Sequence, residues 1–183
     1  MRSLVQSLDI ALFRLINVSG QNFFFDWFMP FMSDLSNFYV ALLLLAALVV
    51  MRNWKAGLVF LVFLGATLAL TDTSSNRILK EWIGRIRPCA VLEDIRLITD
   101  CNTSYSFPSI HAVNVFAGAF FFSQVFRGRM APVFYAIAAM VAYSRVYLGI
   151  HYPLDVVGGA AIGLLMAWPM RRLKDRVVNH YQW

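Results

Sequence analysis

The chain has 183 residues, of which 60% are hydrophobic and only 14% are charged, and its mean hydropathy is +0.63. Soluble domains carry about 25% charged residues, and a chain of this length has no core large enough to explain the deficit. The net charge of +6 does not indicate nucleic-acid binding, because the basic residues stand at the ends of apolar runs. We therefore expect a single domain over residues 1–183 that is embedded in the lipid bilayer.

Residues 1–33 are predicted to lie at the membrane surface or to insert only in part. Residues 1–20 lack the continuous apolar core of a signal peptide, and their amphipathic pattern favours an interfacial helix over a regulatory segment. The apolar face of this helix is expected to hold Leu4, Leu8, Leu12, Phe13 and Ile16, with Asp9 and Arg14 elsewhere. The aromatic-rich stretch 23–32 contains Asp26 and Pro30, which indicates a second interfacial or partly inserted helix.

Five apolar runs are predicted to form transmembrane helices, at about 38–51, 56–70, 112–126, 131–143 and 156–170. Each approaches the roughly 20 residues that span a bilayer once its flanking turns are included. The spans must be helices, since no barrel-type alternation is present and backbone groups in hydrocarbon need internal partners. The predicted fold is therefore an all-α transmembrane bundle with its core at 36–176. It has five spans, or six if residues 4–33 insert as a helical pair.

The charged residues predict how the bundle is oriented. One face carries eight basic residues and a single acid, Asp175, whereas the other carries the remaining eight basic residues and nine acids. By the positive-inside rule the first face is cytoplasmic. Its basic residues are Arg52, Lys55, Arg127, Arg129, Arg171, Arg172, Lys174 and Arg176. We expect a multi-pass protein with a cytoplasmic C-terminus and with loops 81–108 and 145–155 facing outward, which for a protein of the bacterial inner membrane means the periplasm or exterior.

The outward segments contain cations suited to one compact anion. Lys80 follows the second span, Arg87 lies seven residues later, and Arg145 closes the fourth span. Arginine binds phosphate oxygens in a bidentate manner, and ionisable groups at membrane level are costly unless they serve a function. Ser109 stands at a helix N-cap, so the backbone amides of Ile110 and the residue after it point toward the same anion.

Two outward histidines supply candidate groups for catalysis, His111 at the start of the third span and His151 before the fifth. Pro153 suits the first turn of the fifth helix, which places Asp155 inside that turn and within reach of His151. A carboxylate that holds one imidazole nitrogen leaves the other free and nucleophilic. His180 lies in the predicted cytoplasmic tail and is not part of this set.

Together these residues form three spaced blocks, and the chain resembles the type 2 phosphatidic acid phosphatase superfamily. The blocks are Lys80-x6-Arg87-Pro88, then Pro108-Ser109-x-His111, then Ser144-Arg145-x5-His151-x3-Asp155. Ten specified positions agree, in order and with the family spacing, over residues 80–155.

The resemblance implies a mechanism without metal or cofactor. His151 would attack phosphorus to form a phosphohistidine, Asp155 would orient it, and His111 would serve first as general acid and then as base. The phosphate ligands would be Lys80, Arg87, Ser109, Arg145, the amide of Ile110, and Ser144. The substrates that the family suggests are undecaprenyl pyrophosphate, the 1-phosphate of lipid A, phosphatidylglycerol phosphate and phosphatidic acid.

One position departs from the family pattern, because Ile110 stands where glycine is usual. Its backbone amide is retained, whereas its branched side chain must find room in the pocket. Arg85, inside the first block, is either an additional cation or an interfacial anchor. A zinc site built from two histidines and an aspartate is disfavoured, because three nearby cations would repel a dication.

Two other activities use the same residues: phosphotransfer to a second lipid, or binding of a lipid phosphate without turnover. Cys89 and Cys101 both lie in the outward loop, where a disulfide is favoured over two free thiols. No nucleic-acid partner is expected, and the sequence specifies no oligomeric state.

Overall fold

The computed structural model describes residues 4–182, and every regular element in that range is helical. The helices are α1 (Leu4–Arg14), α2 (Phe23–Ser33), α3 (Tyr39–Arg52), α4 (Trp54–Ser74), α5 (Lys80–Ile83), α6 (Pro88–Val91), α7 (Ile110–Val125), α8 (Ala131–Tyr147) and α9 (Pro153–His180). Short π segments, Leu15–Ser19 and Ser75–Leu79, continue α1 and α4. Turns of 3-10 helix, Leu35–Phe38 and Gly128–Met130, precede α3 and α8.

The prediction of a transmembrane helix bundle is confirmed. Within the described residues, 4 helical stretches are long and apolar enough to cross a membrane: Leu35–Arg52, Trp54–Val91, Gly128–Tyr147 and Pro153–His180. The remaining predicted span, the third along the chain, is α7, a shorter apolar helix of 16 residues. Residues 4–33 form two helices of 11 residues each, and each is about 16 Å long at 1.5 Å per residue.

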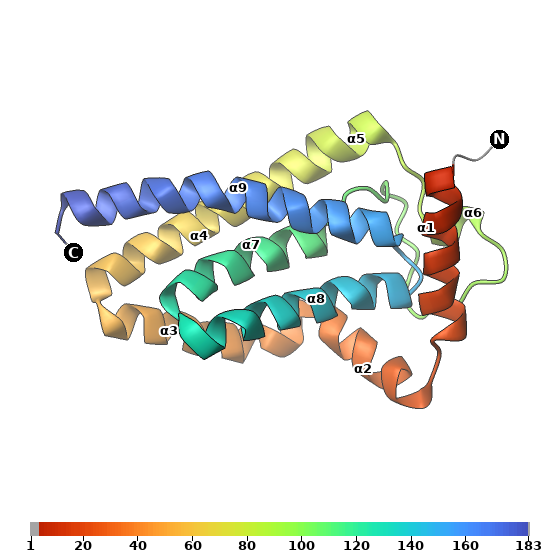
Figure 1. Cartoon of the computed structure of the whole chain (residues 1–183), viewed down its shortest axis with the longest axis horizontal. Helices are drawn as coiled ribbons and strands as arrows, with labels where there is room; N and C mark the ends of the chain where they lie inside the picture. Colours follow the sequence, from red (N-terminus) through yellow and green to blue (C-terminus); the bar gives the residue numbers. More distant parts are fainter. Residues whose placement is uncertain (1–3, 183) are drawn as a thin grey trace.

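Helix α7 lies in the centre of the bundle, in contact with α4, α8 and α9 (Figure 1). It buries a stripe of apolar side chains that includes Ala112, Val113, Ala117, Phe121 and Phe122. At about 24 Å it is shorter than the roughly 30 Å hydrocarbon core, so its N-terminus starts inside the bundle. The non-helical segment before it, residues 92–109, leads from the end of the bundle that α1 crosses back to that N-terminus (Figure 1).

The two ends of the bundle differ in charge. The α3–α4 turn, the α7–α8 connection and the C-terminus lie at one end, and α1 crosses the other end rather than running along the bundle (Figure 1). At the first end Arg52 donates from Nη1 to the carbonyl of Val125 at 3.3 Å. The eight basic residues that predicted the cytoplasmic face thus belong to segments that meet at the end opposite α1.

Helix α1 is amphipathic and lies at the bundle end, but one residue of its predicted apolar face, Phe13, lies on the other face. Asp9 and Phe13 are buried, and the following π segment buries Asn17 in the same i, i+4, i+8 stripe. Leu4, Leu8 and Leu12 are exposed instead. The assignment of Phe13 to the leucine face was wrong, because at 100° per residue Phe13 lies beside Asp9 and nearly opposite Leu4. The protein-facing stripe is therefore partly polar, and the leucines face outward.

The α7–α9 contact depends on glycines in α9. A Cβ added to Gly163 would lie 2.2 Å from the carbonyl oxygen of Val113, and one added to Gly159 would lie 2.7 Å from that of Ser109. The two backbones therefore approach more closely than any side chain allows, as is common where membrane helices pack. This contact fixes Ser109, at the start of α7, against the helix that carries Asp155.

We expect Gly163→Ala to destabilise the protein by about 1–3 kcal/mol, because the added methyl overpacks the α7–α9 contact. The thermal unfolding temperature in detergent measures this effect. Gly118→Ala, in α7, is the matched control, since a Cβ there meets nothing within 4 Å. Equal unfolding temperatures for the two variants would contradict the close-approach assignment.

Candidate active site

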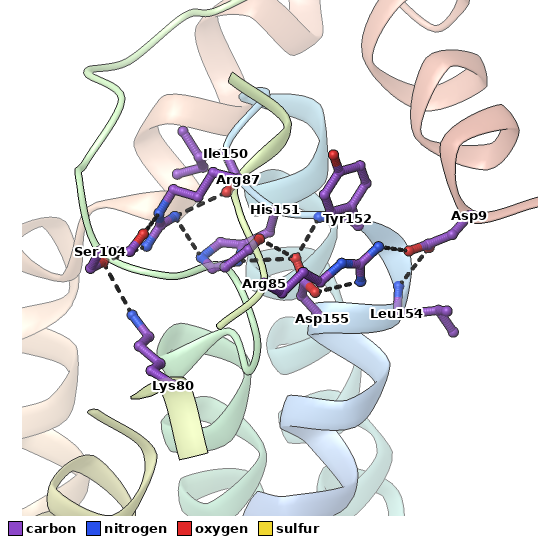
Figure 2. Close-up of polar contacts among 11 residues, drawn as sticks. Asp9, Lys80, Arg85, Arg87, Ser104, Ile150, His151, Tyr152, Leu154 and Asp155 are labelled. Carbon is purple, nitrogen blue, oxygen red and sulfur yellow. Dashed lines mark hydrogen bonds and ion pairs between the residues drawn. The ribbon is translucent and has the colours of Figure 1, made fainter. Parts of the chain in front are cut away.

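Lys80 and Arg87 meet at Ser104, at the end of the bundle that α1 crosses (Figure 2). Lys80 Nζ donates to Ser104 Oγ at 3.3 Å, and Arg87 Nη2 donates to the same oxygen at 3.0 Å. Arg87 Nε also donates to the Ser104 carbonyl at 2.8 Å. Both cations are buried, and the hydroxyl that they share carries no charge. Because buried charges need a counter-ion, this arrangement suits an anionic ligand.

The contact between Arg87 and His151 identifies the free nitrogen of the imidazole. Arg87 Nη1 lies 3.1 Å from His151 Nε2 and also donates to the Ile150 carbonyl at 2.9 Å. Arginine has no acceptor, so Nε2 must present its lone pair and the proton of the neutral ring is carried by Nδ1. His151 Nδ1 faces Asp155 Oδ2 at 3.6 Å, which is longer than a hydrogen bond. The unprotonated Nε2 therefore faces the cations.

His151 is held in its neutral form by its surroundings. Burial lowers the pKa of this imidazole to about 4, and the positive charges of Arg87 and Arg145 also lower the pKa, whereas Asp155 raises it. A neutral imidazole at physiological pH keeps the lone pair that a nucleophile needs.

A tight turn after α8 places His151. Gly149 has φ +88, and a Cβ on it would lie 2.4 Å from the carbonyl oxygen of Arg96, so only glycine fits there. The backbone amide of His151 then donates to the Arg145 carbonyl at 3.3 Å. The turn therefore folds the backbone of His151 back onto the last turn of α8.

Asp155 is fully buried and is surrounded by hydrogen-bond donors (Figure 2). Its Oδ2 accepts from the backbone amide of Tyr152 at 2.8 Å and from the hydroxyl of Ser106. Its Oδ1 accepts from Arg85 Nη1 at 2.7 Å. The prediction that Pro153 and Asp155 lie in the first turn of this helix is confirmed, since α9 begins at Pro153. The carboxylate is held rigidly beside His151.

Two other predicted phosphate ligands present buried donors without partners. Arg145 donates from Nη1 to Ser33 Oγ, while its Nε is buried and unpaired among the described residues. Ser109 is the N-cap residue of α7, but its hydroxyl caps nothing and is also buried and unpaired there. The hydroxyl of Ser144 instead donates to the Val141 carbonyl of its own helix at 2.7 Å.

His111 and Ile110 form the first turn of α7, and both are half-buried. The positive charges of Arg145, Arg87 and Lys80 all act on His111, so the second histidine shares the electrostatic environment of the first. Residues from the three sequence blocks are thereby brought together from α5, α7, α8, the loop before α6 and the start of α9. Within residues 4–182, no group of three His, Cys, Asp or Glu side chains is placed to hold a metal ion.

The loop that carries Ser104 and Ser106 is tied to the first block. Cys89 and Cys101 form a disulfide, two residues after Arg87 and three before Ser104. The backbone amide of Ser106 also donates to the Arg85 carbonyl at 2.6 Å. The loop thus returns to the segment from which it departs.

Four residues of the site were not expected from the sequence, namely Asp9, Arg85 in its observed role, Ser104 and Ser106. Arg85 is neither a free cation nor an interfacial anchor, because its guanidinium joins Asp155 and Asp9. The two serines stand in a polar loop without periodicity, where many serines are solvated. The only signal for Asp9 was a single acid in an amphipathic helix, which suits a solvated face equally well.

The chain is similar in sequence to known phosphatases. Residues 56–178, which contain all three blocks, match the family model described as PAP2 superfamily. The lipid A 4'-phosphatase of Bacteroides thetaiotaomicron is 35% identical over 122 residues, which cover 63% of this chain and 54% of that protein. The chain therefore spans about half the length of that relative.

Two further proteins match nearly the whole chain. Phosphatidylglycerophosphatase B of Bacillus subtilis is 29% identical over 196 residues, covering 97% of this chain and 89% of that protein. The crystal structure of Aquifex aeolicus LpxE superposes with a TM-score of 0.73 at 27% identity, covering 90% of this chain and 95% of that chain. The helix arrangement is thus shared with a solved protein along almost its entire length.

Proposed function

The chain belongs to the PAP2 superfamily, as the three blocks predicted, and we propose that it hydrolyses the phosphate or pyrophosphate of a lipid headgroup. It is a membrane enzyme of a phosphatase family, and the named relatives act on lipid A and on phosphatidylglycerophosphate. A substrate of this kind keeps its acyl or prenyl chains in the bilayer while its phosphate enters the bundle end.

The observation that carries the proposal is the direction of the His151 lone pair. Nε2 faces Arg87, which also contacts Ser104, and on the other side of the ring Nδ1 faces Asp155. A phosphate bound by Lys80, Arg87 and Arg145 therefore lies on the side of the ring that can attack it.

The reaction proceeds in two displacements at phosphorus. In the first, the Nε2 lone pair of His151 forms a P–N bond and the bond from phosphorus to the leaving oxygen breaks. His111 donates a proton to that oxygen, which leaves as the lipid alcohol or lipid phosphate. In the second, His111 takes a proton from water, whose oxygen forms a bond to phosphorus as the P–N bond breaks. Lys80, Arg87 and Arg145 stabilise the charge on the phosphoryl oxygens in both steps.

The proposed site faces the periplasm or cell exterior. The eight basic residues of the opposite end favour the cytoplasm by the positive-inside rule, and the disulfide at the site end requires an oxidising compartment. The exposed leucines of α1 suit a helix lying on the outer leaflet beside the site.

A phosphate-release panel tests the proposed function. The purified protein is assayed with lipid A, undecaprenyl pyrophosphate, phosphatidylglycerol phosphate and phosphatidic acid, each in the presence of EDTA. We expect release from at least one lipid and no inhibition by EDTA, because side-chain cations replace a metal. In the same assay, intact spheroplasts should hydrolyse a short-chain form of the active substrate added from outside.

Three possible results would each contradict one part of the proposed function. Absence of release from all four lipids would reject the hydrolase assignment, and strong inhibition by EDTA would reject the metal-independent mechanism. Hydrolysis by spheroplasts only after permeabilisation would reverse the proposed orientation.

A further inference from the structure

Helix α1 reaches Asp155 through one arginine. Arg85 Nη2 lies 2.5 Å from Asp9 Oδ2 on α1, and Arg85 Nη1 lies 2.7 Å from Asp155 Oδ1 on α9 (Figure 2). The guanidinium therefore bridges two carboxylates whose side chains are both completely buried. The guanidinium of arginine is planar and has five N–H donors, so it can bind two carboxylates at once. The ammonium group of lysine cannot do so with the same geometry.

The bridge is also held on its remaining sides. Asp9 Oδ1 accepts from the backbone amide of Leu154 at 2.9 Å, so the carboxylate from α1 contacts the first turn of α9 directly. The Arg85 guanidinium lies 4.0 Å from the centroid of the Tyr152 ring, at a distance typical of a cation–π contact. Asp9 thus contacts both the arginine that holds Asp155 and the helix turn that carries Asp155.

The bridge balances charge beside His151. Besides Arg85, the charged or titratable groups that interact with His151 or with its partner Asp155 are Lys80 on α5, Arg87 before α6, His111 on α7 and Arg145 on α8. Arg85 alone would neutralise Asp155 and leave the cations unopposed. Because Asp9 neutralises Arg85 in turn, the Asp9–Arg85–Asp155 series keeps a net negative charge next to the imidazole.

We propose that Asp9 and Arg85 are positioning residues for the reaction, holding Asp155 against His151 and preserving the negative charge that the imidazole requires. This inference rests on the proposed function, and it makes α1 part of the catalytic apparatus rather than only a surface anchor. Asp9 acts through Arg85, and Arg85 acts through Asp155; neither touches the phosphate.

The test combines turnover with a direct titration of His151. Arg85→Gln, Asp9→Asn and the double variant are prepared with labelled histidine, and the His151 pKa is measured by NMR alongside kcat and KM on the active lipid. Loss of the Arg85 charge should raise the His151 pKa by about half a pH unit or more, and loss of the Asp9 charge should lower it. The double variant should return toward the wild-type value, because one charge of each sign is removed. In Arg85→Gln, kcat should fall on the order of 10²-fold with KM nearly unchanged.

A second ion pair at the same end of the protein supplies the matched control. Arg96 pairs with Asp26 at 2.8 Å and donates to the Tyr147 hydroxyl rather than to Asp155. Arg96→Gln and Asp26→Asn make the same charge changes and should leave the His151 titration unaltered. A wild-type His151 titration in Arg85→Gln and Asp9→Asn would overturn the proposal, as would equal shifts in the control pair.

The two proposals can fail separately. If the wild-type protein releases phosphate from no lipid but the His151 pKa follows the bridge variants, the hydrolase function fails and the assignment of the bridge stands. If wild-type turnover is observed and both variants retain the wild-type kcat and titration, only the bridge assignment fails. Asp9→Asn keeps an acceptor for the Leu154 amide, so it provides a folded variant if Arg85→Gln does not fold.

Discussion

His151→Ala is expected to reduce phosphate release by about 10³-fold or more, because it removes the proposed nucleophile. The three cations of the site are unchanged in this variant, so the lipid should still bind with a similar KM. Incubation with substrate labelled in the phosphate should leave no acid-labile phosphate on the variant, whereas the wild-type protein should carry it transiently. Initial rates and acid-labile labelling measure the two effects.

The matched control for this variant is His180→Ala. His180 is the last residue of α9, exposed at the end opposite the site, and its removal should leave the rate within about twofold of wild type. Because His151 is buried, thermal unfolding must show that the alanine variant is folded. Phosphate release at the wild-type rate by folded His151→Ala would refute the phosphohistidine mechanism.

His111→Ala is expected to lower the rate by about 10²–10⁴-fold on a lipid substrate, since it removes the proposed general acid and base. The loss should shrink on an aryl phosphate, because a phenolate leaves without needing a proton. The second displacement still lacks its base, so this variant should accumulate phosphorylated His151. Rates on the two substrate types and the amount of acid-labile phosphate on the protein provide the measurement.

The dependence on the leaving group distinguishes catalysis from support of the fold. A residue that merely stabilised α7 would reduce both substrates by the same factor. An equal loss on the lipid and the aryl phosphate, with no phosphorylated protein, would reject His111 as the acid. The double variant His111→Ala with His151→Ala should carry no phosphate at all, which checks that His151 is the site of attachment.

Part of the site was predictable from the sequence because some of its residues are close together along the chain, so that local backbone geometry places them near one another. His151 and Asp155 are four residues apart on either side of a proline that starts a helix, so their proximity follows from the chain itself. The position of Ser109 at the start of α7 follows in the same way from its place before an apolar run. The family blocks then join these local pieces into one site, which periodicity alone does not do.

Contacts between distant segments were not predictable in the same way. Asp9 and Leu154 are separated by 145 positions, and Asn17 contacts the Tyr147 carbonyl across 130. The sequence pattern of an amphipathic helix that contains one acidic residue is the same whether that residue faces water or a buried arginine. The Asp9 face is buried because α1 packs across the end of the bundle, where polar groups bind the Asp9 carboxylate. This packing is a property of the tertiary structure.

Composition and charge by themselves determined that this chain is a membrane helix bundle, because the hydrophobic runs and the helical hydrogen bonding that a bilayer demands are properties of continuous segments. The spacing of the three blocks likewise determined the family. Tertiary structure alone decided which nitrogen of His151 faces the cations, since that depends on the side of the ring that Arg87 occupies. It also decided that Arg85 pairs with Asp155 and Asp9. A guanidinium can bind any carboxylate or phosphate that lies within hydrogen-bond distance. Which anion lies there depends on how the helices pack.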